Sequence, residues 1–312
     1  MALRAGQADS LASLERTSAA SGTAHARAAL LGNPSDGYGG KTIAVTVRDF
    51  AAEVVARPSR VSDGPALDLT RVALERFEAH SQAAGIPARR PGSLACRTEI
   101  PRQVGLGGSS AIVIATLRAL AAFNGIEIGA DRLAELALAA EVEGLGIAAG
   151  PQDRVAQAHG GLVYMDFDPA AARVHQRLDP GLLPPLFLAY GDASDSAGTV
   201  HAELRRQFER GDDALARAME EIAGLAERGR ACLLAGDHGA FGALMDANVD
   251  ARARIVALEP GHARMVEIAR AQGAHANYAG SGGAIVGVQP EDGVEALRAA
   301  LAAEGGELIE GA

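Results

Sequence analysis

The chain has 312 residues, of which 48% are hydrophobic and 22% charged, and this composition is typical of a globular protein with one large or two smaller domains. Acidic residues outnumber basic ones, 39 to 29, and no basic block stands out, so nucleic acid is not an expected partner. There is no membrane-length apolar run, no signal-peptide pattern, and no metal-ligand spacing around Cys96 and Cys232; a cytoplasmic protein that binds no membrane is expected.

The first half of the chain mixes short strand patterns with longer helical ones. Residues 1–22 are rich in Ala and Ser and are expected to form an extension. A short apolar run at 26–32 leads into turn-forming residues at 32–40, and strict alternation at 43–47 predicts a strand. The patterns then predict helices at 68–85, at 110–123 and from a cap at Asp131 to Gly144.

The second half of the chain contains most of the helical pattern. Helices are expected through 200–271, with interruptions at glycines, and again at 291–303. Strands are predicted at 162–167, 186–190, 275–279 and 284–288. Prolines at 180–185 suggest a junction between one domain at 23–184 and a second at 185–312. This mixture of elements predicts an α+β fold.

A glycine-rich segment at 101–111 reads Pro-Arg-Gln-Val-Gly-Leu-Gly-Gly-Ser-Ser-Ala and runs directly into the helix predicted at 110–123. Its glycines allow the backbone to approach a bulky ligand, and the N–H groups at the helix start favour an anion. The segment has neither the Gly-Lys-Ser/Thr ending of a Walker A loop nor the spacing of a Rossmann fingerprint. An ordinary helix-capping turn is the alternative.

Two further segments carry candidate catalytic and binding groups. Arg27 precedes the loop that contains Asp36, and a cation followed by a carboxylate suits a polyhydroxy substrate, although Asp36 alone would fit an Asx turn. Glu141 and Asp153 flank a Gly-rich stretch at 144–150. Taken by itself, Asp153 is equally well explained as a catalytic base or as a helix N-cap.

The segments together, in their order, resemble the GHMP kinases. The phosphate loop of that family reads Pro-x-x-x-Gly-Leu-Gly-Ser-Ser-Ala, and here one extra glycine stands before the serines. Leu-Leu-Gly-Asn-Pro-Ser-Asp at 30–36 and Gln-Asp-Arg-Val-Ala-Gln at 152–157 are similar to the glucuronokinase branch, as is the stretch at 194–201. The Gly-rich turn at 278–284 resembles the third GHMP motif. Asn33 and Pro34 depart from the Glu and His that are usual in GHMP sugar kinases.

The resemblance implies a ribosomal-S5-like N-terminal domain that binds ATP and a ferredoxin-like C-terminal domain. Asp153 would take or orient the proton of the acceptor hydroxyl, and Arg27 would offset charge on the transferred phosphoryl group. Mg²⁺ would be held by Ser110 and Glu141. The nucleotide phosphates would be cradled by the loop residues Gly105, Leu106, Gly107, Gly108, Ser109 and Ser110.

The resemblance also implies an ATP-dependent sugar 1-kinase that acts on D-glucuronate. The substrate-binding residues would be Asp36, Tyr38, Lys41, Ser196, Arg205 and Gly282. Among the cations that could meet a substrate carboxylate, Lys41 ranks first and Arg205 second, and the alternative role for Arg154 is to brace the neighbouring aspartate. Two alternatives stay open: a GHMP kinase for a neutral sugar or a sugar phosphate, and a non-catalytic sensor of sugar and ATP. The sequence does not indicate an oligomeric state.

Overall fold

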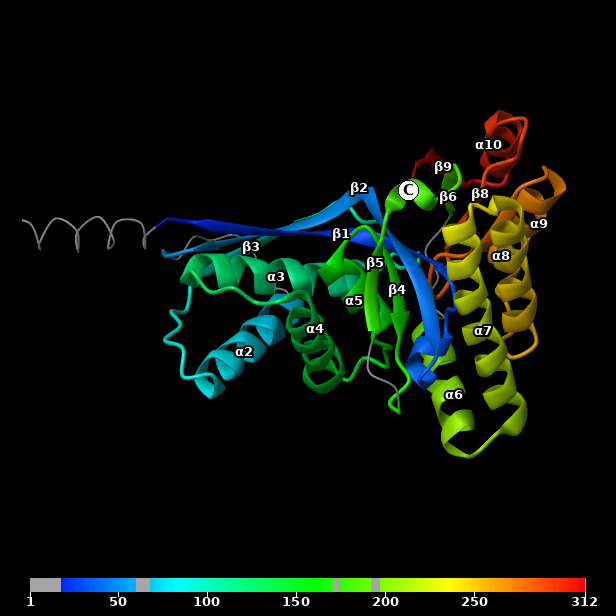
Figure 1. The fold of residues 1–312 in the computed structure, drawn as a ribbon. Helices are drawn as coiled ribbons and strands as arrows, with labels where there is room; N and C mark the ends of the chain where they lie inside the picture. The colour runs from blue at the N-terminus through cyan, green and yellow to red at the C-terminus, as the bar shows by residue number, and fades with distance from the viewer. Residues whose placement is uncertain (1–17, 60–67, 171–173, 192–196, 312) are drawn as a thin grey trace, which may run out of the picture.

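The computed structural model describes residues 18–59, 68–170, 174–191 and 197–311, and Figure 1 shows how they are arranged. Residues up to 178 form a five-stranded sheet, and residues 186–310 form a four-stranded one. The predicted junction at 184–185 lies between the two sheets. None of the described helices is both long and apolar enough to cross a membrane.

The first sheet is antiparallel, with the order β1-β2-β4-β5. β3 pairs with residues 52–57 of β2, whereas β4 pairs with residues 41–45 of the same strand. One face of it carries four helices, among which α3 is the most deeply buried (Figure 1). The strands are β1 (Ala20–Leu31), β2 (Lys41–Arg57), β3 (Ser93–Thr98), β4 (Leu162–Asp166) and β5 (Val174–Leu178). The helices are α2 (Asp68–Ala83), α3 (Gly108–Asn124), α4 (Ala130–Leu145) and α5 (Gln152–His159), and η1 (Ser35–Tyr38) is a 3-10 turn between β1 and β2.

The second sheet has the order β7-β8-β6-β9 and is also antiparallel. Its strands are β6 (Leu186–Tyr190), β7 (His275–Tyr278), β8 (Ala284–Val288) and β9 (Glu307–Glu310), preceded by a 3-10 turn, η2 (Pro180–Leu182). Its helices are α6 (Ala197–Glu209), α7 (Asp213–Ala235), α8 (His238–Ala253), α9 (Pro260–Ala271) and α10 (Glu295–Ala302). In Figure 1, α7 and α8 stand beside each other at the side where β1 and β2 join.

One hydrophobic cluster extends across both halves, and a second cluster lies within the second half alone. Leu31 and Ile43 of the first sheet belong to the same buried cluster as Leu188 of β6 and Phe241 of α8. α7 lies so close to the first sheet that a Cβ atom on Gly229 would be 2.1 Å from Leu31 Cδ1. By contrast, Leu204 of α6 belongs to a small separate cluster with Leu215 and Met219 of α7.

Several predicted elements need correction. The apolar run at 26–32 is the end of β1, and the strand predicted at 43–47 is only the start of β2, which continues past the exposed Arg48 and Asp49. Asp131 does not cap α4, because Gly129 occupies the N-cap position and Asp131 lies in the first turn. Three short strands, β3, β5 and β9, were not predicted, since each carries mostly half-exposed or exposed side chains.

Candidate active site

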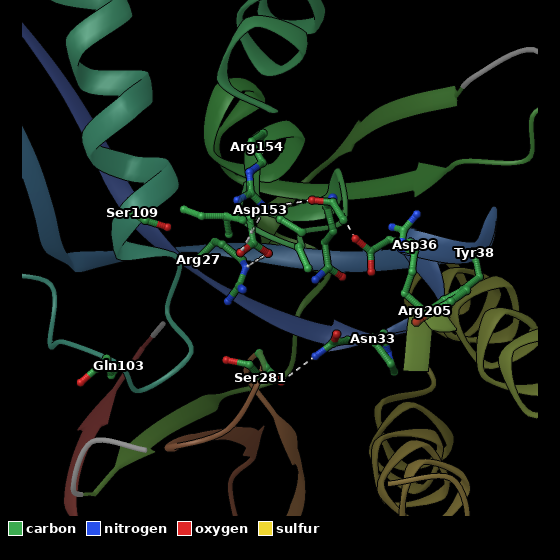
Figure 2. A pocket seen from close by; sticks show the side chains of 18 residues that line it. Arg27, Asn33, Asp36, Tyr38, Gln103, Ser109, Asp153, Arg154, Arg205 and Ser281 are labelled. Atoms are coloured by element: carbon green, nitrogen blue, oxygen red, sulfur yellow. Dashed lines mark hydrogen bonds and ion pairs between the residues drawn. The ribbon is translucent and has the colours of Figure 1, made fainter. Parts of the chain in front are cut away.

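A cavity of about 480 Å³ lies where β1, η1, the start of α3, the start of α5 and the turn after β7 meet. Figure 2 shows Ser109 and Gln103 at one end of it, Asp36, Tyr38 and Arg205 at the other, and Arg27, Asp153 and Arg154 between them. The cavity is lined by Arg27, Asn33, Pro34, Asp36, Gly37, Tyr38, Gln103, Ser109, Ile147, Ala148, Ala149, Gly150, Gln152, Asp153, Arg154, Arg205, Gly280 and Ser281.

An ion pair between Arg27 and Asp153 occupies the centre of the cavity. Arg27 points from β1 and is only 3% exposed; its Nε donates to Asp153 Oδ1 at 2.6 Å. Its Nη1 donates to the carbonyl oxygens of Gly105 and Ala279, each at 2.7 Å, so that the guanidinium joins the glycine-rich loop to the turn after β7. The two groups that the motifs predicted to act together are therefore in direct contact.

Asp153 lies in the first turn of α5, whose N-cap position is Pro151, and it makes no capping bond. Burial alone would raise its pKa, but the charges of Arg27 and Arg154 hold the pKa of Asp153 below its usual value. The carboxylate is therefore ionised near neutral pH. Such a group is suited to accept a hydrogen bond from an attacking hydroxyl and to orient it, in a reaction that needs little proton removal before the transition state.

A second buried pair lies next to the first. Glu141 of α4 is fully buried, and its Oε2 accepts from Arg154 Nε at 2.6 Å. Its other oxygen, Oε1, accepts from the Ser109 hydroxyl at 2.7 Å. The four charged groups thus alternate in sign, from Arg27 and Asp153 through Arg154 to Glu141, which lies behind the cavity lining rather than in it. Each buried charge of this set therefore has an opposite charge beside it.

The structure replaces Ser110 with Ser109 as the serine beside Glu141. Ser110 is fully buried, its hydroxyl donates to the Gly107 carbonyl at 3.0 Å, and it does not line the cavity. If the family pattern is aligned from Pro101 without a gap, Gly108 takes the place of its first serine and Ser109 the place of its second. That alignment is the signal from which Ser109 could have been chosen as the serine beside Glu141.

The glycine-rich loop reaches the cavity through its ends. Gly105 and Gly107 both adopt the left-handed conformation, with φ of 79° and 72°, and Gly107 is the N-cap residue of α3. A Cβ atom on Gly107 would face Gln157 Nε2 at 3.0 Å and Ser110 Oγ at 3.3 Å, so the loop is tightly packed on its inner side. Leu106 is buried, and of the loop segment only Gln103 and Ser109 line the cavity. The start of α3 offers the N–H groups and dipole that suit a phosphate.

The donor set at this end of the cavity fits Mg²⁺. Mg²⁺ prefers hard oxygen ligands and is usually held by one or two protein groups together with waters and substrate phosphates. Ser109 Oγ and Glu141 Oε1 are two such oxygens, 2.7 Å apart. Arg154 fixes only the other oxygen of Glu141, which leaves Oε1 directed at Ser109.

The opposite end of the cavity is shaped by η1 and α6. Asp36 Oδ2 accepts from the backbone N–H of Gln152 at 3.1 Å, so it is held by α5 rather than by a local Asx turn. Burial, followed by the negative charge of Asp153, raises the pKa of Asp36 to about 6. The Tyr38 ring packs against Phe208 of α6, with ring centroids 4.8 Å apart. Hydroxyl-rich ligands are well matched to this mixture of acceptor and donor groups.

Arg205 approaches the same end from α6, and its Nη2 would lie 3.8 Å from a Cβ atom on Gly37. Within the described residues no carboxylate lies within ion-pair distance of its guanidinium. Lys41, which ranked first as partner for a substrate carboxylate, instead pairs with Glu227 at 2.8 Å and does not line the cavity. The structure therefore favours Arg205 over Lys41.

Two other residues were predicted to bind the substrate, Ser196 and Gly282. Ser196 falls outside the described residues. Gly282 packs beside the loop, where its carbonyl oxygen would be 2.6 Å from a Cβ atom on Gly105, and it does not line the cavity. Its neighbours Gly280 and Ser281 do.

The motifs missed the residues that hold this turn in place. Asn33 Nδ2 and Arg252 Nη1 both donate to the Gly280 carbonyl, at 2.8 and 2.7 Å, and Arg252 Nη2 donates to that of Ser281 at 3.1 Å. Asn33 stands where GHMP sugar kinases usually have Glu, and that departure was its only signal. Arg252 lies within a long helical pattern that carries no motif.

Comparisons with known proteins agree with this geometry. The family model for the GHMP kinases N terminal domain matches residues 68–161. Glucuronokinase 1 of Arabidopsis thaliana is 37% identical to this chain, and the match covers 89% of this chain and 87% of the relative. Probable glucuronokinase 2 of the same plant is 38% identical, and the match covers 85% of this chain and 83% of the relative. The crystal structure of Lactococcus lactis galactokinase complexed with galactose shares the fold, with a TM-score of 0.78 and 16% identity over 96% of this chain and 97% of that one. The chain therefore belongs to the GHMP kinases, a family of ATP-dependent phosphotransferases.

Proposed function

We propose that the protein phosphorylates the anomeric hydroxyl of D-glucuronate with ATP, giving D-glucuronate 1-phosphate and ADP. The observation that carries this proposal is the arrangement of charges along the cavity. The start of α3 with Ser109 and Glu141 suits a nucleotide phosphate, and Arg205, a cation without a carboxylate partner among the described residues, lies at the far end. The likeness to the plant glucuronokinases supports the same substrate.

In this reaction the anomeric oxygen attacks the γ-phosphorus, and the bond to the oxygen bridging the β- and γ-phosphorus atoms breaks. Asp153 orients the hydroxyl and accepts its proton as the new bond forms. Arg27, held in contact with Asp153, lies where negative charge develops on the transferred group. Bound Mg²⁺ would neutralise charge on the β- and γ-phosphates, and Ser109 and Glu141 would hold it.

At the sugar end, Asp36 would accept hydrogen bonds from sugar hydroxyls, and Tyr38 would define the pocket wall. Arg205 would meet the C6 carboxylate, the group that distinguishes glucuronate from glucose. A charge-assisted hydrogen bond of this kind contributes about 1.5–3 kcal/mol, which corresponds to roughly 10- to 150-fold in affinity. The division into an ATP-binding domain at 23–184 and a second domain at 185–312, and a cytoplasmic location, belong to the same proposal.

The test is a coupled assay of ADP release with MgATP and a panel of glucuronate, galacturonate, glucose and galactose. We expect turnover with glucuronate to exceed that with either neutral sugar. Arg205→Met should raise KM for glucuronate about 10-fold or more and leave KM for ATP unchanged, while the matched variant Lys41→Met should change neither. Equal turnover of glucose or galactose would reduce the proposal to a general sugar kinase. Binding of sugar and ATP without turnover would indicate a sensor.

A further inference from the structure

We infer that Asp131, His159 and His175 form a binding site for a divalent transition-metal ion of the Zn²⁺ type, separate from the Mg²⁺ ligands proposed above. The three side chains come from three different elements. Asp131 lies in the first turn of α4, His159 is the last residue of α5, and His175 is in β5. Neither the kinase reaction nor any motif of the family pattern uses them.

The donor atoms of the three residues converge on one point. Asp131 Oδ1 lies 2.7 Å from His159 Nε2 and 2.6 Å from His175 Nδ1, and all three atoms are within 4.8 Å of one another. Zn²⁺ binds nitrogen at about 2.0–2.1 Å and carboxylate oxygen at about 2.0–2.2 Å, which puts tetrahedral ligand atoms about 3.3 Å apart. The distance between the carboxylate oxygen and each imidazole nitrogen therefore has to increase by about 0.6 Å for an ion to enter.

The exposed Asp131 side chain can make this small movement, whereas the two mostly buried imidazoles are restrained. The Asp131 side chain is 66% exposed and free to shift outward, whereas the imidazoles of His159 and His175 are 13% and 11% exposed. Their rings stand edge to face, with centroids 5.6 Å apart, so that one nitrogen of each faces the carboxylate. Two preorientated imidazoles and a carboxylate are a ligand set that suits Zn²⁺, and they leave a fourth position for water.

The chemistry of the cluster separates it from the Mg²⁺ site. Imidazole nitrogen is a preferred ligand of Zn²⁺, Cu²⁺ and Ni²⁺, whereas Mg²⁺ prefers oxygen. No lysine or arginine of the described chain pairs with Asp131; the neighbouring Arg132 is directed to Glu135 and His80. A divalent cation would therefore face one carboxylate oxygen and two imidazole nitrogens, with no lysine or arginine of the described chain paired to that carboxylate.

The proposed metal site also lies at the end of α5, the helix that carries Asp153. α5 is eight residues long; it carries Asp153 at its start and His159 at its end. An ion at His159 would fasten the end of α5 to α4 and to β5. Asp131 and His175 in addition line a second cavity of about 520 Å³, which Asp36 lines as well.

The experiment uses the full chain, stripped with a chelator and titrated with Zn²⁺ in competition with a chromophoric chelator. We expect one ion per chain, an increase in Tm on binding, and an affinity that falls at least about 100-fold in His159→Gln and in His175→Ala, because each variant removes a ligand. With Co²⁺ as the probe, visible absorption bands should appear in the wild type and be lost in both variants.

Three controls make the result decisive. Ser109→Ala combined with Glu141→Gln removes the proposed Mg²⁺ ligands and should leave the Zn²⁺ affinity unchanged. His275→Asn is matched to the ligand variants, because His275 is also 2.6 Å from a carboxylate oxygen, that of Asp246, but has no second imidazole partner there. If a histidine variant fails to fold, Asp131→Asn tests the same site through an exposed side chain. Zn²⁺ binding that survives in Asp131→Asn, or that is lost with Glu141→Gln, overturns the inference.

Discussion

At the scale of single residues, the site depends on which oxygen faces which cation. Arg27 pairs with Asp153, and Arg154 pairs with Glu141, so each carboxylate has one strong partner. Removing one member of a pair leaves the opposite charge buried without a partner, and this lowers the free energy of unfolding. Substitutions that keep shape but remove charge are therefore the informative ones.

Asp153→Asn should lower kcat by about 10²-fold or more, because the acceptor hydroxyl loses the group that orients it and takes its proton. The affinity for ATP should change little, since Asp153 faces the acceptor side of the cavity. Turnover kinetics and a direct ATP-binding titration check this. A nearly normal kcat would leave Arg27 as the main catalytic group. Asp179→Asn, at a turn remote from the cavity, serves as the control.

Ser109→Ala should raise the Mg²⁺ concentration needed for half-maximal turnover, since it removes a hard oxygen next to Glu141. Ser110→Ala is the matched control, because its hydroxyl faces the Gly107 carbonyl rather than Glu141. Titration of activity with Mg²⁺ at fixed ATP separates the two variants. The opposite pattern would restore Ser110 as the metal-binding serine.

The raised pKa of Asp36 predicts a pH dependence. Ionised Asp36 accepts hydrogen bonds from sugar hydroxyls better than the protonated acid, so kcat/KM for the sugar should rise between pH 5 and pH 7 with an apparent pKa of about 6. The substrate carboxylate is ionised throughout this range. Asp36→Asn should lower kcat/KM and flatten the profile.

The same shift has an opposite effect on stability. The pKa of Asp36 lies above its usual value of 3.8, so the folded chain binds the proton more tightly than the unfolded chain does. The contribution of this group to stability therefore grows as the pH falls through 6 and is complete below 3.8. Urea unfolding of the wild type and of Asp36→Asn at pH 7 and pH 5 measures the difference.

At the scale of elements, the glycine-rich loop is constrained by what surrounds it. Gly107→Val should lower both Tm and the affinity for ATP, because the new side chain would meet Gln157 and Ser110 in a left-handed conformation that valine rarely adopts. The damage would come through the shape of the loop rather than through a direct block of the phosphates. Gly108→Ala is the matched control, since its Cβ atom would meet only Ile100 at 3.5 Å. Unchanged ATP affinity in Gly107→Val would remove the loop from the nucleotide site.

Local patterns predicted the helices better than the strands. The predicted ends of α2 and α3 lie within two residues of the observed ends. Apolar periodicity and the glycines that stop a helix are local signals, which lie in or next to the helix itself. β3 and β5 have polar sequences and are strands because β2 and β4 supply their hydrogen-bond partners from elsewhere in the chain. The second half of β2, with Asp49 and Glu53 exposed, owes its extension to pairing with β1 and β3.

The site shows the same difference between what local sequence patterns predict and what depends on the rest of the fold. Arg27, Asp36, Glu141 and Asp153 stand in segments that resemble family motifs. The structure places Arg27, Asp36 and Asp153 around one cavity (Figure 2), and Arg154 links Asp153 to the buried Glu141. The choice between Ser109 and Ser110 depended on where the extra glycine is placed in the alignment. The choice between Arg205 and Lys41 depended on side-chain direction, which a motif does not contain. The roles of these residues remain predictions.

At the scale of the whole molecule, a buried asparagine joins the two halves. Asn248 of α8 accepts from the Gly32 N–H at 2.7 Å and donates to the Asn33 carbonyl at 3.0 Å, and it is fully buried. Asn248→Ala should lower the free energy of unfolding by about 2–4 kcal/mol, since two buried backbone groups lose their partners. Urea unfolding monitored from both halves should still show one transition. Two separate transitions would mean that the halves unfold independently.

The weak attachment of α6 has a consequence for how substrates enter and leave. Since the sheets share a continuous core, swinging one half away from the other would expose much apolar surface. Among the side chains that the structure describes, tilting α6 would disturb the small cluster around Leu204 and the ring contact between Tyr38 and Phe208. Arg205 is part of that helix, so under the proposed function a movement of α6 would release the carboxylate end of the product together with the product itself. The movement of this helix, rather than phosphoryl transfer, would then limit turnover.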